Sequence, residues 1–385
     1  GTGRNVDSGA LANGNFDLSQ AQDPAALPDL SETQIAVDGL AVAASSHQAI
    51  VATAVTLGLS FQPFVGDAVA LTAVSNVAGG STLAYINGGS IDTRLAASGG
   101  TDIYVGAGSQ TYSNTLIVSG AIGGGFAGAG AGSGTNLTRT TKAYVTNAAV
   151  GGTNKPNNVT VRASSTQVSS NIVIGLAIGF GGGAASVLVN KFSADTEAYI
   201  DGGSVTASGL AVNASSVNGF FAAAGAGSAG IIGIAGAFVV GLSSDTTKAY
   251  IGDSSQDTTI NVSSALAVSA ISDNTFNSYS IGGSFAGLGA VAGMADATVV
   301  NNTTEARIER ATGTQQSSSV AVNAQETVTI SPTTGAGALA TAGAGIGAGV
   351  NIVMLKSTVA ATVLNSTLNT SGAFNVSAGS AKNIN

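Results

Sequence analysis

The chain has 385 residues, a formal net charge of −8 and only 8% charged residues, against a usual share of about 25%. It holds one histidine and no cysteine or tryptophan, which excludes thiol nucleophiles, disulfides and zinc sites with cysteine ligands. The 12 basic residues form no cluster that could neutralise the phosphates of DNA or RNA, so nucleic-acid binding is excluded.

The amino-terminal stretch differs in composition from the rest of the chain. Six of the 20 acidic residues fall within residues 1–38, together with a single basic residue. Pro24 and Pro28 lie in the same stretch, and the motif that marks the repeats is absent from it. We interpret residues 1–33 as an acidic irregular segment, either a cap, a linker or an inter-subunit docking extension. Residues 34–385 are interpreted as one repeat domain.

Two short motifs alternate along the remainder of the chain. The first places an alanine before an aromatic or branched residue and a turn rich in glycine and asparagine. Its copies are LAYINGGSI (83–91), KAYVTNAAV (142–150), EAYIDGGSV (197–205), KAYIGDSSQ (248–256), EARIERATG (305–313) and AATVLNSTL (360–368). The second motif, such as GLAVNASSV at 209–217, follows each copy and also precedes the first one at 39–47. Both recur in phase with a mean period of about 55 residues, so the chain is an array of repeats.

Each period has the pattern of β-strands. In the second motif apolar residues alternate with small or polar ones, as at Leu210 and Val212, which is typical of a half-buried strand. The first motif alternates in the same way and then reaches residues that favour turns.

A third type of segment, uncharged and rich in glycine and alanine, separates the motifs. Examples are 171–190, 219–242 and 333–355. Their length would suit a membrane helix, but they return every period between polar strands and lack flanking tryptophan or basic anchors. We therefore expect core strands in which small side chains allow close approach, and no membrane spanning.

The period and the strand pattern together predict an all-β fold, a β-solenoid of the right-handed parallel β-helix type built of about six 55-residue repeats. We expect each period to form two coils of about 27 residues or three of about 18, giving a rod about 60–90 Å long. Lys142, Glu197, Lys248 and Glu305 occupy one motif position and alternate in sign. They form a ladder only if successive periods lie one coil apart, because two or three coils separate them by about 10–14 Å.

Four of the seven tyrosines, Tyr85, Tyr144, Tyr199 and Tyr250, also occupy a single motif position. We interpret them as residues that pack or stack on the surface of the repeats. The alternative is an aromatic strip that binds carbohydrate.

Asp195, Asp201, Asp245 and Asp253 lie near expected turns, at equivalent places in two periods. We interpret them as turn formers that hydrogen-bond the local backbone. The alternative is Ca²⁺ bound between coils. Calcium is the only cofactor that the sequence suggests.

Catalytic chemistry finds little support in the sequence. Neither a P-loop nor a G-x-S-x-G nucleophile motif occurs, and the sparse charges supply no acid–base cluster, so we expect no enzymatic activity. An ice-binding face would need regular threonine rows, whereas threonines cluster in pairs at expected turns. These pairs are Thr246 with Thr247 and Thr303 with Thr304.

The pattern A-Y-[IV]-x-[GN], a small-residue turn, L-x-V-x-A-S and a long Gly/Ala-rich stretch resembles the repeats of large exported bacterial adhesins of the filamentous-haemagglutinin and leukotoxin type. The similarity covers residues from about 34 to 385. It implies β-helical fibres at the surface of diderm bacteria, commonly exported through a partner outer-membrane pore. Since neither a secretion domain nor a toxin tip is recognisable, the resemblance implies the shaft.

We therefore predict a structural or adhesive shaft, or a polymerising subunit, of an extracellular bacterial surface fibre. The repeats begin at the strand of Leu40 and stop just after the equivalent strand of Phe374, so a second copy would continue the array head to tail. Expected partners are other copies or neighbouring repeats of a longer chain, with a host or matrix glycan or protein as a further ligand. The alternative function is a carbohydrate- or ice-binding module.

Overall fold

The computed structural model describes residues 4–7, 34–37, 39–62, 65–93, 101–253 and 256–385. Strands account for most of these residues and none of them is helical, so the predicted all-β class is confirmed. Of the glycine- and alanine-rich segments, 219–242 lies within one strand, whereas 171–190 and 333–355 each comprise two strand ends and the turn between them. In the described part of the chain, no helix has the length and hydropathy that a membrane crossing requires.

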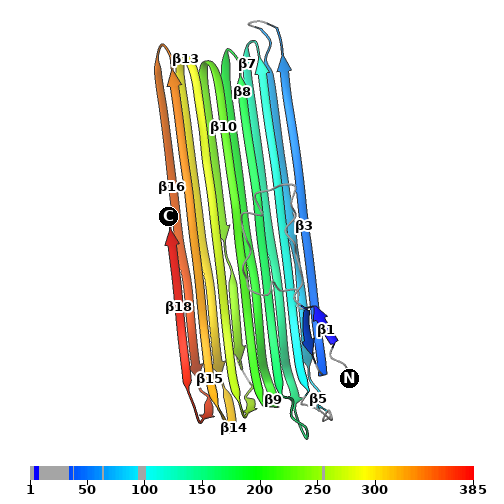
Figure 1. The fold of residues 1–385 in the computed structure, drawn as a ribbon. Coiled ribbons are helices and arrows are strands. Elements are labelled where there is room, and N and C mark those ends of the chain that lie inside the picture. The colour runs from blue at the N-terminus through cyan, green and yellow to red at the C-terminus, as the bar shows by residue number, and fades with distance from the viewer. Residues whose placement is uncertain (1–3, 8–33, 38, 63–64, 94–100, 254–255) are drawn as a thin grey trace.

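Long strands form two layers (Figure 1). The strands of the first layer start at the end of the molecule that carries the turns after the first motif and run toward the opposite end, whose turns we call the distant turns. These strands are β3 (Gly39–Ser60), β6 (Asp102–Gly123), β8 (Asn158–Ile178), β15 (Ser319–Ala340) and β18 (Phe374–Ile384). The strands of the second layer run back and are β4 (Ala68–Asn87), β7 (Phe126–Val150), β9 (Gly181–Ala207), β11 (Thr246–Ile251) and β16 (Ala344–Leu364). Two longer elements, β10 (Gly209–Ser243) and β13 (Ala265–Glu309), begin in the first layer and return in the second.

Short strands connect the return strands to the next outward ones. They are β5 (Ser90–Ile91), β12 (Thr258–Val262), β14 (Ala311–Ser317) and β17 (Thr367–Thr370). The predicted amino-terminal segment lies outside the described residues, except that β1 (Arg4–Asp7) pairs antiparallel with β2 (Gln34–Val37).

Every strand pairing within the two layers is parallel, and partners lie one period apart in sequence. In the first layer Leu210 pairs with Leu266, and in the second Ala143 pairs with Ala198. Each period therefore contributes one strand to each layer. The expectation of two or three coils per period is wrong, because the glycine- and alanine-rich segments extend the strands of both layers and make a single turn between them in each period.

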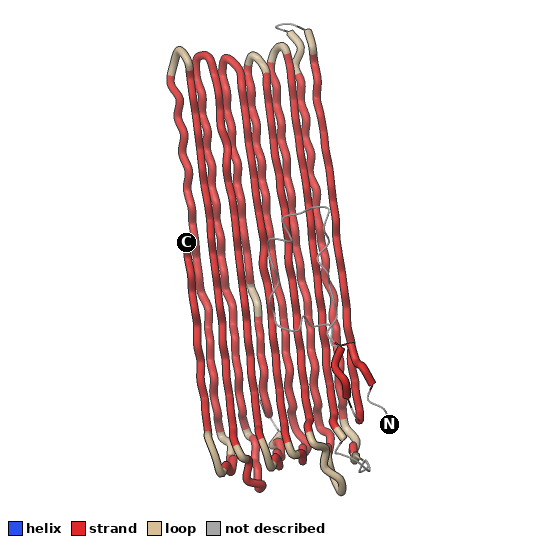
Figure 2. The backbone as a smooth tube through the Cα atoms, viewed as in Figure 1, coloured by secondary structure: helices blue, strands red, loops and turns tan. Residues whose placement is uncertain are grey.

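The resulting molecule is a slab rather than the expected rod (Figure 2). With neighbouring strands about 4.8 Å apart, the stack of strands in the first layer extends only about 30 Å. A strand of 22 residues, such as β3, is about 70 Å long. The strands thus run along the longest dimension of the described molecule.

Identical residue types face the interior in successive periods. We call a set of residues paired in register along the stack a column. One column of the first layer consists of Val42, Val105, Val161, Val212, Val268, Val322 and Val376. The motif alanines of the second layer form another column, and the buried members of both columns belong to one hydrophobic cluster. The second cluster includes the phenylalanines Phe192, Phe220 and Phe276, whose ring centroids lie 5.9 and 4.9 Å apart.

The turns after the first motif contain glycine and asparagine residues with positive φ, as the motif predicts. Gly88 and Gly89 have φ values of 71° and 82°, and Gly202 and Gly203 have values of 67° and 74°. Asn147, aligned with Gly88 and Gly202, also has a positive φ of 52°. These left-handed conformations explain why glycine and asparagine occupy this position in the motif.

The threonine pairs do not lie at turns, contrary to expectation. Thr246 and Thr247 begin β11, and their register partners Thr303 and Thr304 lie inside β13. Thr247 and Thr304 are fully buried between the layers. The alternating direction of side chains along a strand places one threonine of each pair inside and the other outside.

Candidate functional site

The four motif tyrosines form one column on the outer face of the second layer. Their ring centroids are separated by 4.9 Å from Tyr85 to Tyr144, 4.8 Å to Tyr199 and 4.7 Å to Tyr250, with interplanar angles of 6° or less. At one end the guanidinium carbon of Arg307 lies 5.5 Å from the centroid of the Tyr250 ring. The predicted surface stacking is therefore present, one ring per period.

The stacking determines what this column can bind. Each inner ring is covered on both faces by its neighbours, so only ring edges and hydroxyl groups face solvent. Sugar rings stack on free aromatic faces, which the inner tyrosines lack. Burial raises the pKa of Tyr199 to about 12 and also raises that of Tyr250. Both hydroxyls are therefore protonated at neutral pH.

A charged column runs beside the tyrosines. Lys142 Nζ lies 2.9 Å from Glu197 Oε2 and 3.0 Å from Asp195 Oδ2. Burial lowers the pKa of Lys142, but the hydrogen bonds and charges of Glu197 and Asp195 outweigh it and raise the pKa overall. Lys248 is in register with Glu197 on one side and Glu305 on the other. The alternating residues are thus neighbours one strand apart, the spacing at which a ladder forms.

Arg307 joins the two columns at their end. Its guanidinium contacts Asp253 and lies 3.6 Å from Glu305 Oε1 and 3.4 Å from Glu309 Oε2. It replaces the tyrosine of the earlier periods, so the aromatic column gives way to a cation surrounded by carboxylates.

The four candidate calcium ligands are not brought together. Asp195 lies on the outer face beside Lys142, and the backbone N–H of Asp253 donates to Asp201 Oδ1 at a turn. Asp245 lies between the layers and is 2% exposed. Among the described residues, no group of three or more histidine, cysteine or acidic side chains is placed to hold a metal ion.

Asp245 is held by hydrogen bonds from three directions. Its Oδ1 accepts from the backbone N–H of Ala194 at 2.9 Å, and its Oδ2 accepts from the Ser243 hydroxyl at 2.6 Å. Its own N–H donates to Asn302 Oδ1 at 3.2 Å. Burial raises the pKa of Asp245 to about 6, against these hydrogen bonds, which lower it; the charge of Glu326 raises it further. Asp245 is therefore a bonded core residue and not a turn former.

Asp245 belongs to a band of buried polar residues between the two hydrophobic clusters. This band was not predicted from the sequence. Glu326 is 2% exposed, and neither of its carboxylate oxygens has a hydrogen-bond partner among the described residues. Arg139 is also buried and donates from Nη2 to Ser46 Oγ at 2.6 Å. The sequence contains one signal for the inward direction of Asp245. Asp245 lies four residues before the buried motif alanine Ala249, and residues an even number of positions apart on a strand point to the same face.

The two ends of the stack carry open strands that occupy the same columns over the 11 residues of β18, which is half the length of the 22-residue β3. β3 pairs with β6, and β18 pairs with β15; neither has a second neighbour in the first layer among the described residues. Leu40, Val42 and Ala44 of β3 occupy the same columns as Phe374, Val376 and Ala378 of β18. An unpaired strand presents backbone N–H and C=O groups that another strand can bind.

Comparison with protein-family models, with curated proteins and with solved structures found no match.

Proposed function

We propose that the chain is a β-solenoid that serves as the shaft, or as a polymerising subunit, of an extracellular bacterial surface fibre. The observation that carries this proposal is the in-register pairing of strands one period apart across the whole stack, up to the open strands β3 and β18. A stack whose two ends match by a shift of one period can be extended by another period without a change in register.

The side-chain columns support a load-bearing role. Interior valines repeat at the strand spacing from β3 to β18, and stacked tyrosines and alternating charges each do so over four successive strands. Each added strand in such a column gains the same contacts as the one before it. Parallel backbone hydrogen bonds then run continuously along the stack. The right-handed winding belongs to this proposal, because nearly all crossovers between parallel strands have that hand.

The geometry does not favour the alternative of a carbohydrate- or ice-binding module. The inner tyrosine faces cover each other. The outer threonine column is interrupted by Asp195, which is bonded to Lys142. The surface location on a diderm bacterium rests on the adhesin resemblance of the repeats.

Electron microscopy and light scattering of the purified chain test self-assembly. We expect filaments about 70 Å wide whose axial repeat is about 4.8 Å, with mass increasing with protein concentration. Particles of one-chain mass at every concentration would contradict head-to-tail assembly. They would assign the open strands to neighbouring repeats of a longer chain.

Edge variants identify the contact. The Asn385 N–H donates to Ile330 O of β15, and N–H groups alternate in direction along a strand. The N–H groups of Ala378 and Ser380 therefore face the open side of β18. Proline lacks a backbone N–H, so the double substitution Ala378→Pro and Ser380→Pro should shorten or abolish filaments. The matched control is Ala378→Ser with Ser380→Ala, which keeps both N–H groups. Equal filament lengths in the two variants would exclude β18 as the contact.

A further inference from the structure

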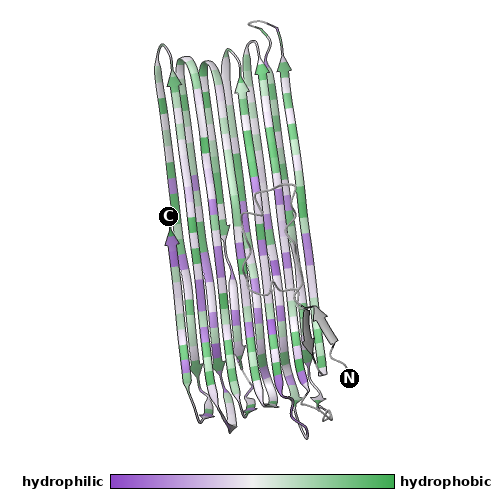
Figure 3. Ribbon diagram, viewed as in Figure 1, coloured by the Kyte–Doolittle hydropathy of each residue, from purple (hydrophilic) through white to green (hydrophobic). Residues whose placement is uncertain are grey.

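Hydrophobic residues are frequent at the end of the slab that carries the distant turns (Figure 3), and many of their side chains are exposed there. In the first layer this apolar surface comprises the columns of Val55, Leu57 and Leu59, and in the second the columns of Val69, Leu71, Ala73 and Ser75. All residues of these columns are apolar or glycine, except Ser75. We call this surface, together with the turns that join the layers, the apolar end.

Large side chains are exposed throughout the apolar end. In the first layer Leu57 is 67% exposed and Leu339 60%, and in the second Leu71 is 73% and Ile346 61% exposed. The turns continue the surface with further exposed residues. These are Phe61, Val65, Phe126, Ile232 and Leu288. Soluble proteins seldom expose a continuous apolar surface of this extent unless it binds a partner or a membrane.

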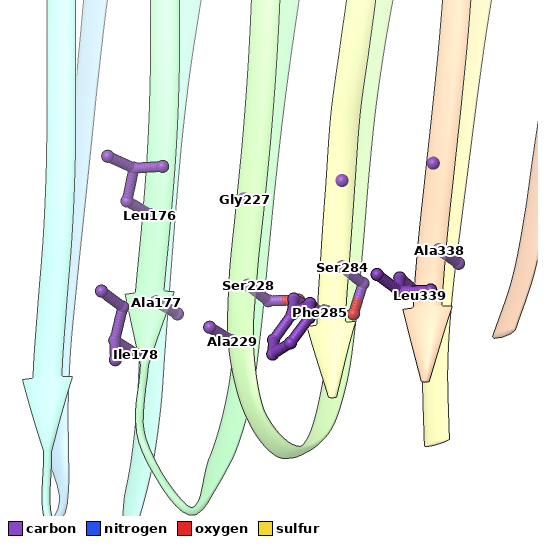
Figure 4. A pocket seen from close by; sticks show the side chains of 12 residues that line it. Leu176, Ala177, Ile178, Gly227, Ser228, Ala229, Ser284, Phe285, Ala338 and Leu339 are labelled. Carbon is purple, nitrogen blue, oxygen red and sulfur yellow. Dashed lines mark hydrogen bonds between the residues drawn. The ribbon is translucent and has the colours of Figure 1, made fainter. Parts of the chain in front are cut away.

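Grooves cross this surface between the large side chains. In the first layer Gly227, Gly283 and Gly337 lie in one column with Leu176 and leave a groove of about 570 Å³ (Figure 4). Ile178 and Phe285 line it on the side toward the turns. In the second layer Gly130 and Gly132 lie in a similar groove of about 400 Å³. Ridges alternating with glycine grooves offer contact area to flexible hydrocarbon chains.

We propose that the apolar end inserts into one leaflet of a zwitterionic lipid bilayer. The shape of the apolar end fits a leaflet, because the apolar surface covers both outer faces and continues onto the turns between them, where the described polar residues include the exposed Gln62 and Asp67. A second protein copy docked on one face would leave the other face in water, whereas a leaflet contacts all three. The depth of the apolar end also fits a leaflet. The columns span about 15–25 Å along the strands, compared with about 15 Å for the hydrocarbon of one leaflet.

Lysines lie at the boundary of the apolar end. Lys191 is exposed on the second layer in the first outer column beyond that of Ser75, and Lys356 is exposed in the second. Tyr279 lies at the corresponding boundary of the first layer. Lysine ammonium groups complement lipid phosphates at this depth, and tyrosine favours the interface between hydrocarbon and water. Backbone groups of the interior strands are paired with neighbouring strands, as hydrocarbon surroundings require.

Flotation with phosphatidylcholine vesicles tests insertion. The full chain should float with the vesicles, and Ile281→Asp should lower its partitioning at least about tenfold because a carboxylate enters hydrocarbon poorly. The matched control is Ile271→Asp, an exposed isoleucine ten positions earlier on the same strand, outside the apolar end. Circular dichroism verifies that both variants keep the strand signal. Absence of flotation by the full chain, or equal loss in both variants, would overturn the proposal.

A tryptophan probe separates lipid from a second copy as the occupant. The chain has no tryptophan, so Phe126→Trp reports from the apolar end and Phe374→Trp from the opposite end of the slab. Vesicles should blue-shift the emission of Phe126→Trp alone, and lipids brominated on the acyl chain should quench it. A blue shift that follows protein concentration without vesicles, together with a doubled mass, would assign the apolar end to a second copy and overturn the lipid proposal.

Discussion

The ring of Phe220 occupies the space that Gly241 leaves on the opposite layer. A Cβ added to Gly241 would collide with Cζ and Cε1 of that ring. Both residues belong to β10, which runs out in one layer and back in the other. The two halves of a single period therefore interlock across the core.

This relationship predicts that Gly241→Ala is destabilising. We expect a loss of about 1–3 kcal/mol in the free energy of unfolding, since the added methyl overpacks the core. In the Phe220→Leu background the same change should cost less, because the smaller side chain makes room. Urea unfolding of the two single variants and the double variant measures the coupling. Additive losses would contradict direct contact between the two positions.

The loss of stability on removal of one tyrosine ring should depend on the position of that ring in the column. Tyr199→Leu breaks two stacked contacts and should destabilise the chain by about 1–3 kcal/mol, because each aromatic pair contributes about 0.5–1.5 kcal/mol beyond burial. Tyr85→Leu breaks only one stacked contact among the described residues and should cost about half as much. Thermal or urea unfolding provides the comparison. Equal losses at the two positions would show that stacking is not the source of the stability.

The buried carboxyl of Asp245 predicts a pH dependence of stability. Its pKa is about 6 in the folded chain, above the ordinary value of 3.8, because of burial. Between these values the native state holds more protons than the unfolded state, so the free energy of unfolding falls as pH rises. A shift of about two pH units corresponds to about 3 kcal/mol, present in acid and lost above about pH 6.

The Asp245→Asn variant should lose this part of the pH dependence. Its amide still accepts from the Ala194 N–H, and it donates to the Ser243 oxygen in place of accepting from it. Urea unfolding from about pH 4 to about pH 7 should give a flatter curve for the variant than for the native chain. The exposed Asp257→Asn variant serves as the control and should keep the native slope. Parallel curves for the native chain and Asp245→Asn would refute the assignment.

The sequence predicted the strands, the period and the turns after the first motif because these depend on local patterns. Alternation at Leu210 and Val212 and positive-φ residues at Gly202 and Gly203 are visible in a few neighbouring letters. The number of coils per period depends on where the glycine- and alanine-rich strands bend. Glycine and alanine fit both strand and corner, so the composition of those segments carries little information on the bend.

The buried polar band was missed for a different reason. Asp245 and Glu326 read as surface or turn residues when only their polarity is considered. Their inward direction follows because they lie an even number of residues from a buried motif alanine or valine. This rule holds only where the strand is continuous between the two residues. The tyrosine column was the easier inference, because a residue repeated at one motif position stacks whenever each period adds one strand.

All of the proposed assembly depends on each period contributing a single strand to each layer, and one crosslink tests this directly. The native chain has no cysteine, and Thr246 and Thr303 are register partners on the outer face of adjacent strands. At one strand spacing, about 4.8 Å, the pair Thr246→Cys and Thr303→Cys lies within the range for a disulfide. At two spacings, about 10 Å, a bridge cannot form without backbone movement. We predict near-complete disulfide formation under mild oxidation, measured by thiol titration and intact mass. Free thiols in the folded chain would contradict the one-strand arrangement.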